Sequence, residues 1–91
     1  MKSERLDYRV GWKGNEGTAC YINEKGLRTE TAGRILIERN KDNVTIRVRD
    51  AENYERNLMT LPRGYSKTWV MMSAELLLDE MLNLAQARSA A

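Results

Sequence analysis

The sequence predicts an α+β domain, an antiparallel β-meander of about four to five strands packed by one C-terminal α-helix over about residues 74–88. Before residue 73, apolar and polar residues alternate with the period of two that is typical of half-buried strands. After residue 73, apolar residues recur every three or four positions, as on a helix with one buried face. The 91 residues suffice for one core, so we treat 1–91 as a single domain.

The first hairpin is predicted from LDYRVGW and TACYIN. In LDYRVGW every second residue is apolar, namely Leu6, Tyr8, Val10 and Trp12. KGNEG then supplies two glycines around Asn-Glu, a composition typical of a turn. TACYIN is the return strand, whereas LRTETAG, residues 27–33, fits either a short strand or a loop.

The segment RILIERNKDNVTIRVR, residues 34–49, predicts a hairpin that turns at Lys41-Asp42. The expected cross-strand pairs are Ile37–Ile46 and Ile35–Val48 on the apolar face, and Leu36–Arg47 and Arg34–Arg49 on the polar face. The pair of Arg34 and Arg49 is unfavourable unless an anion lies near it. A helix over residues 31–40 is the alternative, and Gly33 disfavours it.

The C-terminal part predicts a strand followed by the helix. AENYERN, residues 51–57, is a polar connection or a less regular strand, and residues 68–72 are expected to form a short apolar strand. Ser73 is the expected N-cap, with Glu75 in the first turn. The apolar residues expected on the buried side of the helix are Leu77, Leu78, Met81, Leu82, Leu84 and Ala85.

Several kinds of chemistry are disfavoured by the residues that the chain lacks. It has no histidine, the commonest general base and a common metal ligand. Cys20, the lone cysteine, lies in a predicted strand and is expected to be a small core or half-buried residue. The glycines of GWKGNEG lie between strands, whereas a P-loop opens a helix, and the adjacent acids Asp79 and Glu80 are expected to face solvent. We therefore expect no enzymatic activity, no metal and no cofactor.

The N-terminal sequence MKSERLDYRV lacks the apolar core of a signal peptide, and no apolar run approaches the roughly 20 residues of a membrane span. A lone cysteine fits a reducing compartment. We therefore expect a cytoplasmic protein without a membrane partner.

Arg34, Arg47 and Arg49 are the remaining candidate binding residues, because the hairpin register places them on one face of the sheet. Guanidinium groups contact phosphates, and exposed tyrosines stack on bases; Tyr21, Tyr54 and Tyr65 are candidates for stacking. A solvated face or a protein contact is the alternative. The net charge of +2 decides nothing.

A second candidate surface is apolar. The apolar side of the helix is wide, and Trp69, Met71, Leu76 and Leu84 are expected to form the interface of a two-fold homodimer.

In layout, VTIRVRD and KTWVMM leading into SAELLLDEML resemble the small single-stranded-DNA-binding proteins of the positive-cofactor-four type. The resemblance covers about half of the chain, implies dimerisation through a C-terminal helix, and carries no site residue over. The first hypothesis is therefore a small regulatory protein that binds nucleic acid through the arginine face. The alternative is a protein-binding inhibitor or adaptor of phage or mobile-element type that blocks a host protein, for example anti-CRISPR-like.

Overall fold

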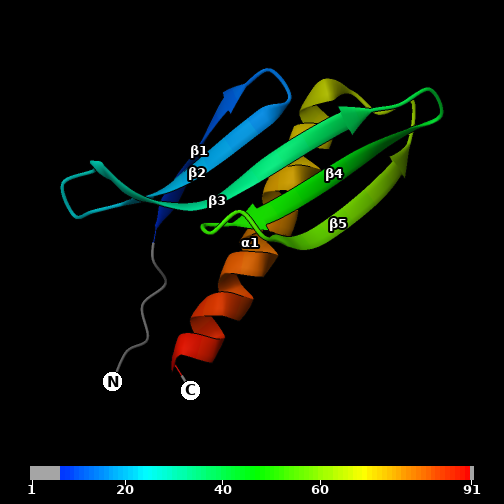
Figure 1. Ribbon diagram of the computed structural model, residues 1–91. Helices are drawn as coiled ribbons and strands as arrows, with labels where there is room; N and C mark the ends of the chain where they lie inside the picture. The colour runs from blue at the N-terminus through cyan, green and yellow to red at the C-terminus, as the bar shows by residue number, and fades with distance from the viewer. Residues whose placement is uncertain (1–6, 91) are drawn as a thin grey trace.

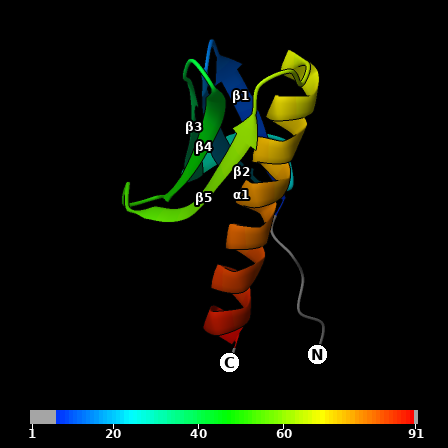
Figure 2. The same cartoon turned by 90° about the vertical axis from the view of Figure 1, so that its right-hand side faces the viewer.

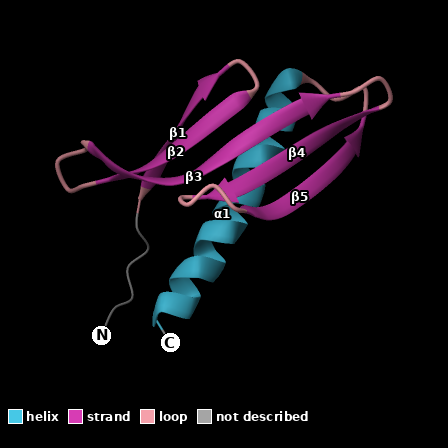
Figure 3. Ribbon diagram, viewed as in Figure 1, coloured by secondary structure: helices cyan, strands magenta, loops and turns pink. Residues whose placement is uncertain are grey.

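The computed structural model describes residues 7–90, with side chains described through residue 84. Within this range the chain forms one sheet and one helix (Figure 1). The elements are β1 (Tyr8–Lys13), β2 (Glu16–Ile22), β3 (Arg28–Arg39), β4 (Asn43–Asp50), β5 (Glu55–Pro62) and α1 (Lys67–Ala90). All neighbouring strands are antiparallel in the order β1-β2-β3-β4-β5 (Figure 3). The predicted meander with one C-terminal helix is confirmed; Leu6, at the start of the first predicted strand, lies outside the described residues.

The central hairpin has the predicted register. Ile37 lies opposite Ile46, and Arg34 lies opposite Arg49. The turn is closed by the backbone N–H of Asn40, which donates to the carbonyl oxygen of Asn43 at 2.8 Å. The segment 27–33, which the sequence left open, belongs mostly to β3.

The core lies between one face of the sheet and α1, which Figure 2 shows on one side of the strands. β3 and β4 direct their isoleucines and valines toward the helix, and the buried cluster includes Ile35, Ile37, Val44, Ile46, Val48, Val70, Leu78 and Leu82. The helix packs closely on the sheet at Gly33, where a Cβ atom would lie 2.8 Å from the carbonyl oxygen of Arg49 and 3.0 Å from Leu78 Cδ1. The sheet thus has one covered face and one face on which no described element packs.

The helix begins earlier than the sequence analysis predicted. It starts at Lys67, so residues 68–72 are helical and the predicted strand there is wrong. The N-cap is Ser66, whose Oγ accepts a hydrogen bond from the backbone N–H of Trp69 at 3.1 Å, and Ser73 lies inside the helix. The physical reason is burial: Val70 and Ala74 are four residues apart and both are buried, so the helical period begins at Val70.

Two carboxylates of α1 hold the edge strand β1. Trp12 Nε1 donates to Glu75 Oε2 at 2.9 Å, and the hydroxyl of Tyr8 donates to Asp79 Oδ1 at 2.9 Å. Asp79, which was expected to face solvent, is therefore half-buried against β1. Within residues 7–90, no helix has both the length and the apolar character needed to cross a membrane.

Candidate anion-binding face of the sheet

The candidate site lies on the face of the sheet that points away from α1, which we call the open face. The strand registers align four residues of β1 to β4 directly across it: Gly11, Thr18, Arg34 and Arg49. The next aligned set is Lys13, Glu16, Leu36, Arg47 and Leu58. Along these two sets the open face carries arginines and a lysine, one hydroxyl, one carboxylate and two leucines.

Arg34 and Arg49 are directly opposite each other on β3 and β4. Neither side chain forms an ion pair or a hydrogen bond with any residue that the structure describes. Two like charges on directly opposed strand positions repel each other. An anion placed between the two guanidinium groups would remove this repulsion and would gain two charge-assisted contacts.

A shallow depression of about 190 Å³ lies beside this pair. Its lining comes from β2, β3 and β4 and consists of Glu16, Gly17, Thr18, Arg34, Ile35, Leu36 and Arg49. Two positive groups and one negative group give the lining a formal net charge of +1, and Thr18 adds a hydroxyl. The depression is suited to a small anionic group, and Glu16 is the one residue of its lining that opposes such a ligand.

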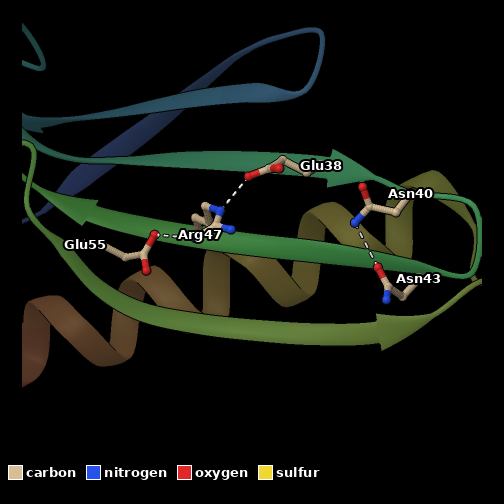
Figure 4. A network of polar contacts seen from close by, with 5 residues as sticks. All are labelled: Glu38, Asn40, Asn43, Arg47 and Glu55. Carbon is tan, nitrogen blue, oxygen red and sulfur yellow. Dashed lines mark hydrogen bonds and ion pairs between the residues drawn. The ribbon is translucent and has the colours of Figure 1, made fainter.

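Arg47, the third arginine of the predicted face, is already neutralised. Its Nε donates to Glu38 at 2.5 Å and its Nη1 donates to Glu55 at 2.9 Å (Figure 4). The hydrogen bonds to Glu55 and Glu38 raise the pKa of the guanidinium further above its ordinary value. The three arginines thus share a face, as predicted, but only Arg34 and Arg49 are available to a ligand.

Two other arginines near the sheet, Arg56 and Arg63, are engaged in holding turns. Arg56 Nε donates to Asp50 Oδ2 at 2.6 Å, and Arg63 donates to the carbonyl oxygen of Asn40 at 2.6 Å. Burial alone would raise the pKa of Asp50, but hydrogen bonds from Arg56 and from the backbone of Tyr54 lower it below its ordinary value. The Asp50 carboxylate is therefore a structural element of the β4–β5 turn.

The tyrosines expected to stack on bases are not on the open face. Tyr21 is half-buried against the core on the helix side. Tyr54 lies in the β4–β5 turn, with the Arg56 guanidinium 5.6 Å from its ring centre. Tyr65 stacks on Trp69 at the start of α1, with ring centres 4.1 Å apart. Contacts to an anion on the open face are therefore made by cations and hydroxyls, without aromatic stacking from these residues.

A second surface lies on the outer side of α1. Tyr65, Trp69, Met72 and Leu76 are spaced by three or four residues and are all exposed, Leu76 to 70%. We call these four residues the apolar stripe; it faces away from the core, because Val70 and Ala74 on the opposite side of the helix are buried.

Two of the predicted interface residues lie outside this stripe. Met71 packs against the core. Leu84 lines a groove of about 560 Å³ between the second half of α1 and the ends of the strands. The charged residues of its lining are Asp50 and Arg56, which form an ion pair, and Glu52.

Among residues 7–90, no group of three or more metal-ligating side chains is close enough to hold a metal ion. No protein-family model matches the chain, and no curated protein or solved structure matches it either. The chemistry of the open face and of the apolar stripe is therefore the basis for a proposed function.

Proposed function

We propose that the chain is a small, cytoplasmic, non-enzymatic binding protein whose open face contacts the phosphate backbone of a nucleic acid through Arg34 and Arg49. The observation that carries the proposal is the pair of unneutralised guanidinium groups directly opposite each other on an uncovered sheet. Nearby Arg47 is held by two carboxylates, whereas Arg34 and Arg49 have no carboxylate partner among the described residues.

The proposed contacts are with phosphates and not with base edges. Sequence-specific readout needs a set of planar hydrogen-bonding side chains or stacking aromatic rings around the bases. The tyrosines suggested for stacking lie elsewhere, and besides the two arginines the depression offers only Thr18 and Glu16 as polar side chains. Binding should therefore tolerate any sequence and should weaken with salt. Two contacts on a single strand give a logarithmic salt slope of about −1.4, or about a sevenfold loss between roughly 50 and 200 mM salt.

The test uses a fluorescein-labelled single-stranded oligonucleotide in anisotropy titrations at low ionic strength. Arg34→Ala and Arg49→Ala should each weaken binding and make the slope shallower by about 0.7. Arg39→Ala is the matched control, because Arg39 lies on the same strand but its partner Val44 is on the helix-facing side. Absence of salt-sensitive binding, or an equal loss in Arg39→Ala, would refute the proposal.

The apolar stripe supports a second candidate function, which is protein binding. Contiguous exposed apolar residues on a small protein mark interaction sites, and aromatic residues and methionine are enriched in interfaces. Tyr65, Trp69, Met72 and Leu76 meet both descriptions. Because two-fold homodimers are the commonest assemblies, we take a second copy of the chain as the first occupant to test, and a host protein as the alternative.

Sedimentation velocity at tens of micromolar tests self-association. Leu76→Glu should abolish the dimer, because it places a charge in the middle of the stripe. Leu84→Glu is the matched control, since Leu84 is also exposed, to 55%, but borders the groove. A wild-type protein that remains monomeric would exclude the homodimer and leave the stripe to a different protein.

A further inference from the structure

A further arginine, Arg28, reaches the open face from the start of β3. Arg28 is the first residue of β3 and is exposed. One of its terminal nitrogens, Nη2, is 3.8 Å from the point where a Cβ atom of Gly11 would lie. That point is on the open face, because Val10 and Trp12 on either side of Gly11 pack toward the core. The guanidinium of Arg28 therefore extends over β1.

Irregular pairing of β2 with β3 explains this position. The register shifts between Ala19 and Cys20 and again between Cys20 and Ile22. In the second shift, β2 advances from Cys20 to Ile22 while β3 moves back from Thr31 to Arg28. Each shift adds one residue to β3, exchanges the faces to which the side chains before it point and increases the local twist. The two exchanges cancel, so Arg28 points to the same face as Arg34, and the two added residues bring Arg28 opposite Ile22.

Arg28, Arg34 and Arg49 place their guanidinium groups along one line across the sheet. Gly11, Thr18, Arg34 and Arg49 are aligned on four adjacent strands. Since adjacent strands are about 4.8 Å apart, this line is about 14 Å long. Guanidinium groups lie at the β1, β3 and β4 positions, and Thr18 supplies a hydroxyl at the β2 position.

The line contains no carboxylate from β1 to β4, whereas the adjacent aligned set contains Glu16. At its β5 end the line meets Glu55, whose carboxylate is bound by Arg47. Arg28 itself forms no ion pair with any described residue. A chain of phosphates that follows this line avoids the carboxylate of Glu16 in the neighbouring set. It meets the guanidinium groups of Arg28, Arg34 and Arg49, which form no ion pair with a described residue.

We infer that Arg28 is a third phosphate contact, and that a bound single strand runs across the β-strands along the line from Arg49 to Gly11. This inference rests on the proposed function of Arg34 and Arg49. Gly11 contributes by lacking a side chain, which leaves the surface of β1 open beneath the Arg28 guanidinium.

The test is an anisotropy titration of the full chain with a labelled single-stranded oligonucleotide at several salt concentrations. Three contacts predict a slope of about −2.1, or about an 18-fold loss between roughly 50 and 200 mM salt. Arg28→Ala should return the slope to about −1.4. Lys25→Ala is the control, because it removes an equal charge from the exposed β2–β3 turn.

Gly11 allows an independent test. Gly11→Glu should weaken binding as much as Arg28→Ala, because its carboxylate would pair with the Arg28 guanidinium. Gly11→Ala should bind like the wild type, since its Cβ makes an ordinary contact at 3.8 Å. A circular-dichroism melt of each variant checks that it folds.

The outcomes separate this inference from the function on which it rests. If Arg34→Ala and Arg49→Ala lose binding but Arg28→Ala binds as well as Lys25→Ala, the third contact is overturned. The proposed function then stays in place. Unchanged binding in Arg34→Ala and Arg49→Ala overturns both.

Discussion

Release of Arg47 from its two carboxylates should strengthen binding of nucleic acid to the open face. Arg47 is held by Glu38 and Glu55 at 2.5 and 2.9 Å. The double variant Glu38→Gln with Glu55→Gln keeps the shape of both side chains and removes both negative charges. Three arginines (Arg34, Arg47 and Arg49) and the two glutamates give this part of the face a formal net charge of +1. The double variant raises this charge to +3.

The size of the effect follows from the number of contacts. One additional free guanidinium makes the logarithmic salt slope steeper by about 0.7. The advantage of the double variant over the wild type should therefore shrink by about 2.6-fold between roughly 50 and 200 mM salt. Stability should change little, because all three side chains are partly exposed, to between 34% and 42%, and exposed ion pairs contribute little.

Anisotropy titrations with a labelled single strand measure both the affinity and the slope. Glu52→Gln with Glu80→Gln is the matched control, because it removes the same charge from the β4–β5 turn and from α1. Equal gains in both double variants would mean that net charge alone decides the affinity. An unchanged slope in Glu38→Gln with Glu55→Gln would show that Arg47 does not reach the bound phosphates, and the reasoning about this face would be wrong.

The remaining predictions concern the fold. Ser66→Ala should lower the free energy of unfolding by about 1 kcal/mol in urea titrations, because it removes the N-cap. Ser73→Ala should not lower it, since alanine is the better helix former. Equal losses in the two variants would contradict the assignment of Ser66 as the cap. Gly33→Ala should cost about 1–3 kcal/mol, because its Cβ would lie 2.8 Å from the carbonyl oxygen of Arg49, and an unchanged urea midpoint would contradict it. Because the folded pKa of Asp50 lies below its ordinary value, its carboxylate stabilises the fold above about pH 4 and loses this contribution as the pH falls through the folded pKa. The difference in stability between the wild type and Asp50→Asn should therefore shrink at low pH, and a difference that is constant with pH would contradict this.

The central hairpin could be predicted because its information is local. Alternation of β-branched residues fixes which face is buried, and a short turn at Lys41-Asp42 fixes the register. A slip of one residue would expose Ile46 and bury Arg47. For this reason the pairing of Arg34 with Arg49 could be predicted from the sequence alone.

The start of the helix could not be placed, because a short apolar run fits either a strand or a helix. Threonine, tryptophan and valine at residues 68–70 favour a strand by composition. Burial of Val70 and Ala74 against the sheet overrides this preference. The sequence does contain a signal for the true start of the helix, because Ser66 directly precedes the first turn and serine is a residue type that caps helices.

The candidate site was predictable only in part. Glu38 is a diagonal neighbour of Arg47 in the predicted hairpin, so that ion pair could have been derived from the register. The ion pair with Glu55 depends on the pairing of β5, and β5 contains an irregularity that sequence patterns do not reveal. The position of Arg28 depends on two register shifts of the same kind.

The two candidate surfaces lie on opposite sides of the molecule, and this arrangement makes them independent. The open face points away from α1, and the apolar stripe points away from the sheet (Figure 2). In a dimer formed through the stripe, the two helices would be in contact and the two open faces would point outward. A short oligonucleotide would then reach the arginines of only one subunit. We therefore expect Leu76→Glu to abolish self-association and to leave the affinity and the salt slope for a short oligonucleotide unchanged. A shallower slope in the Leu76→Glu monomer would show that both subunits contact one strand, which a helix-to-helix dimer does not permit.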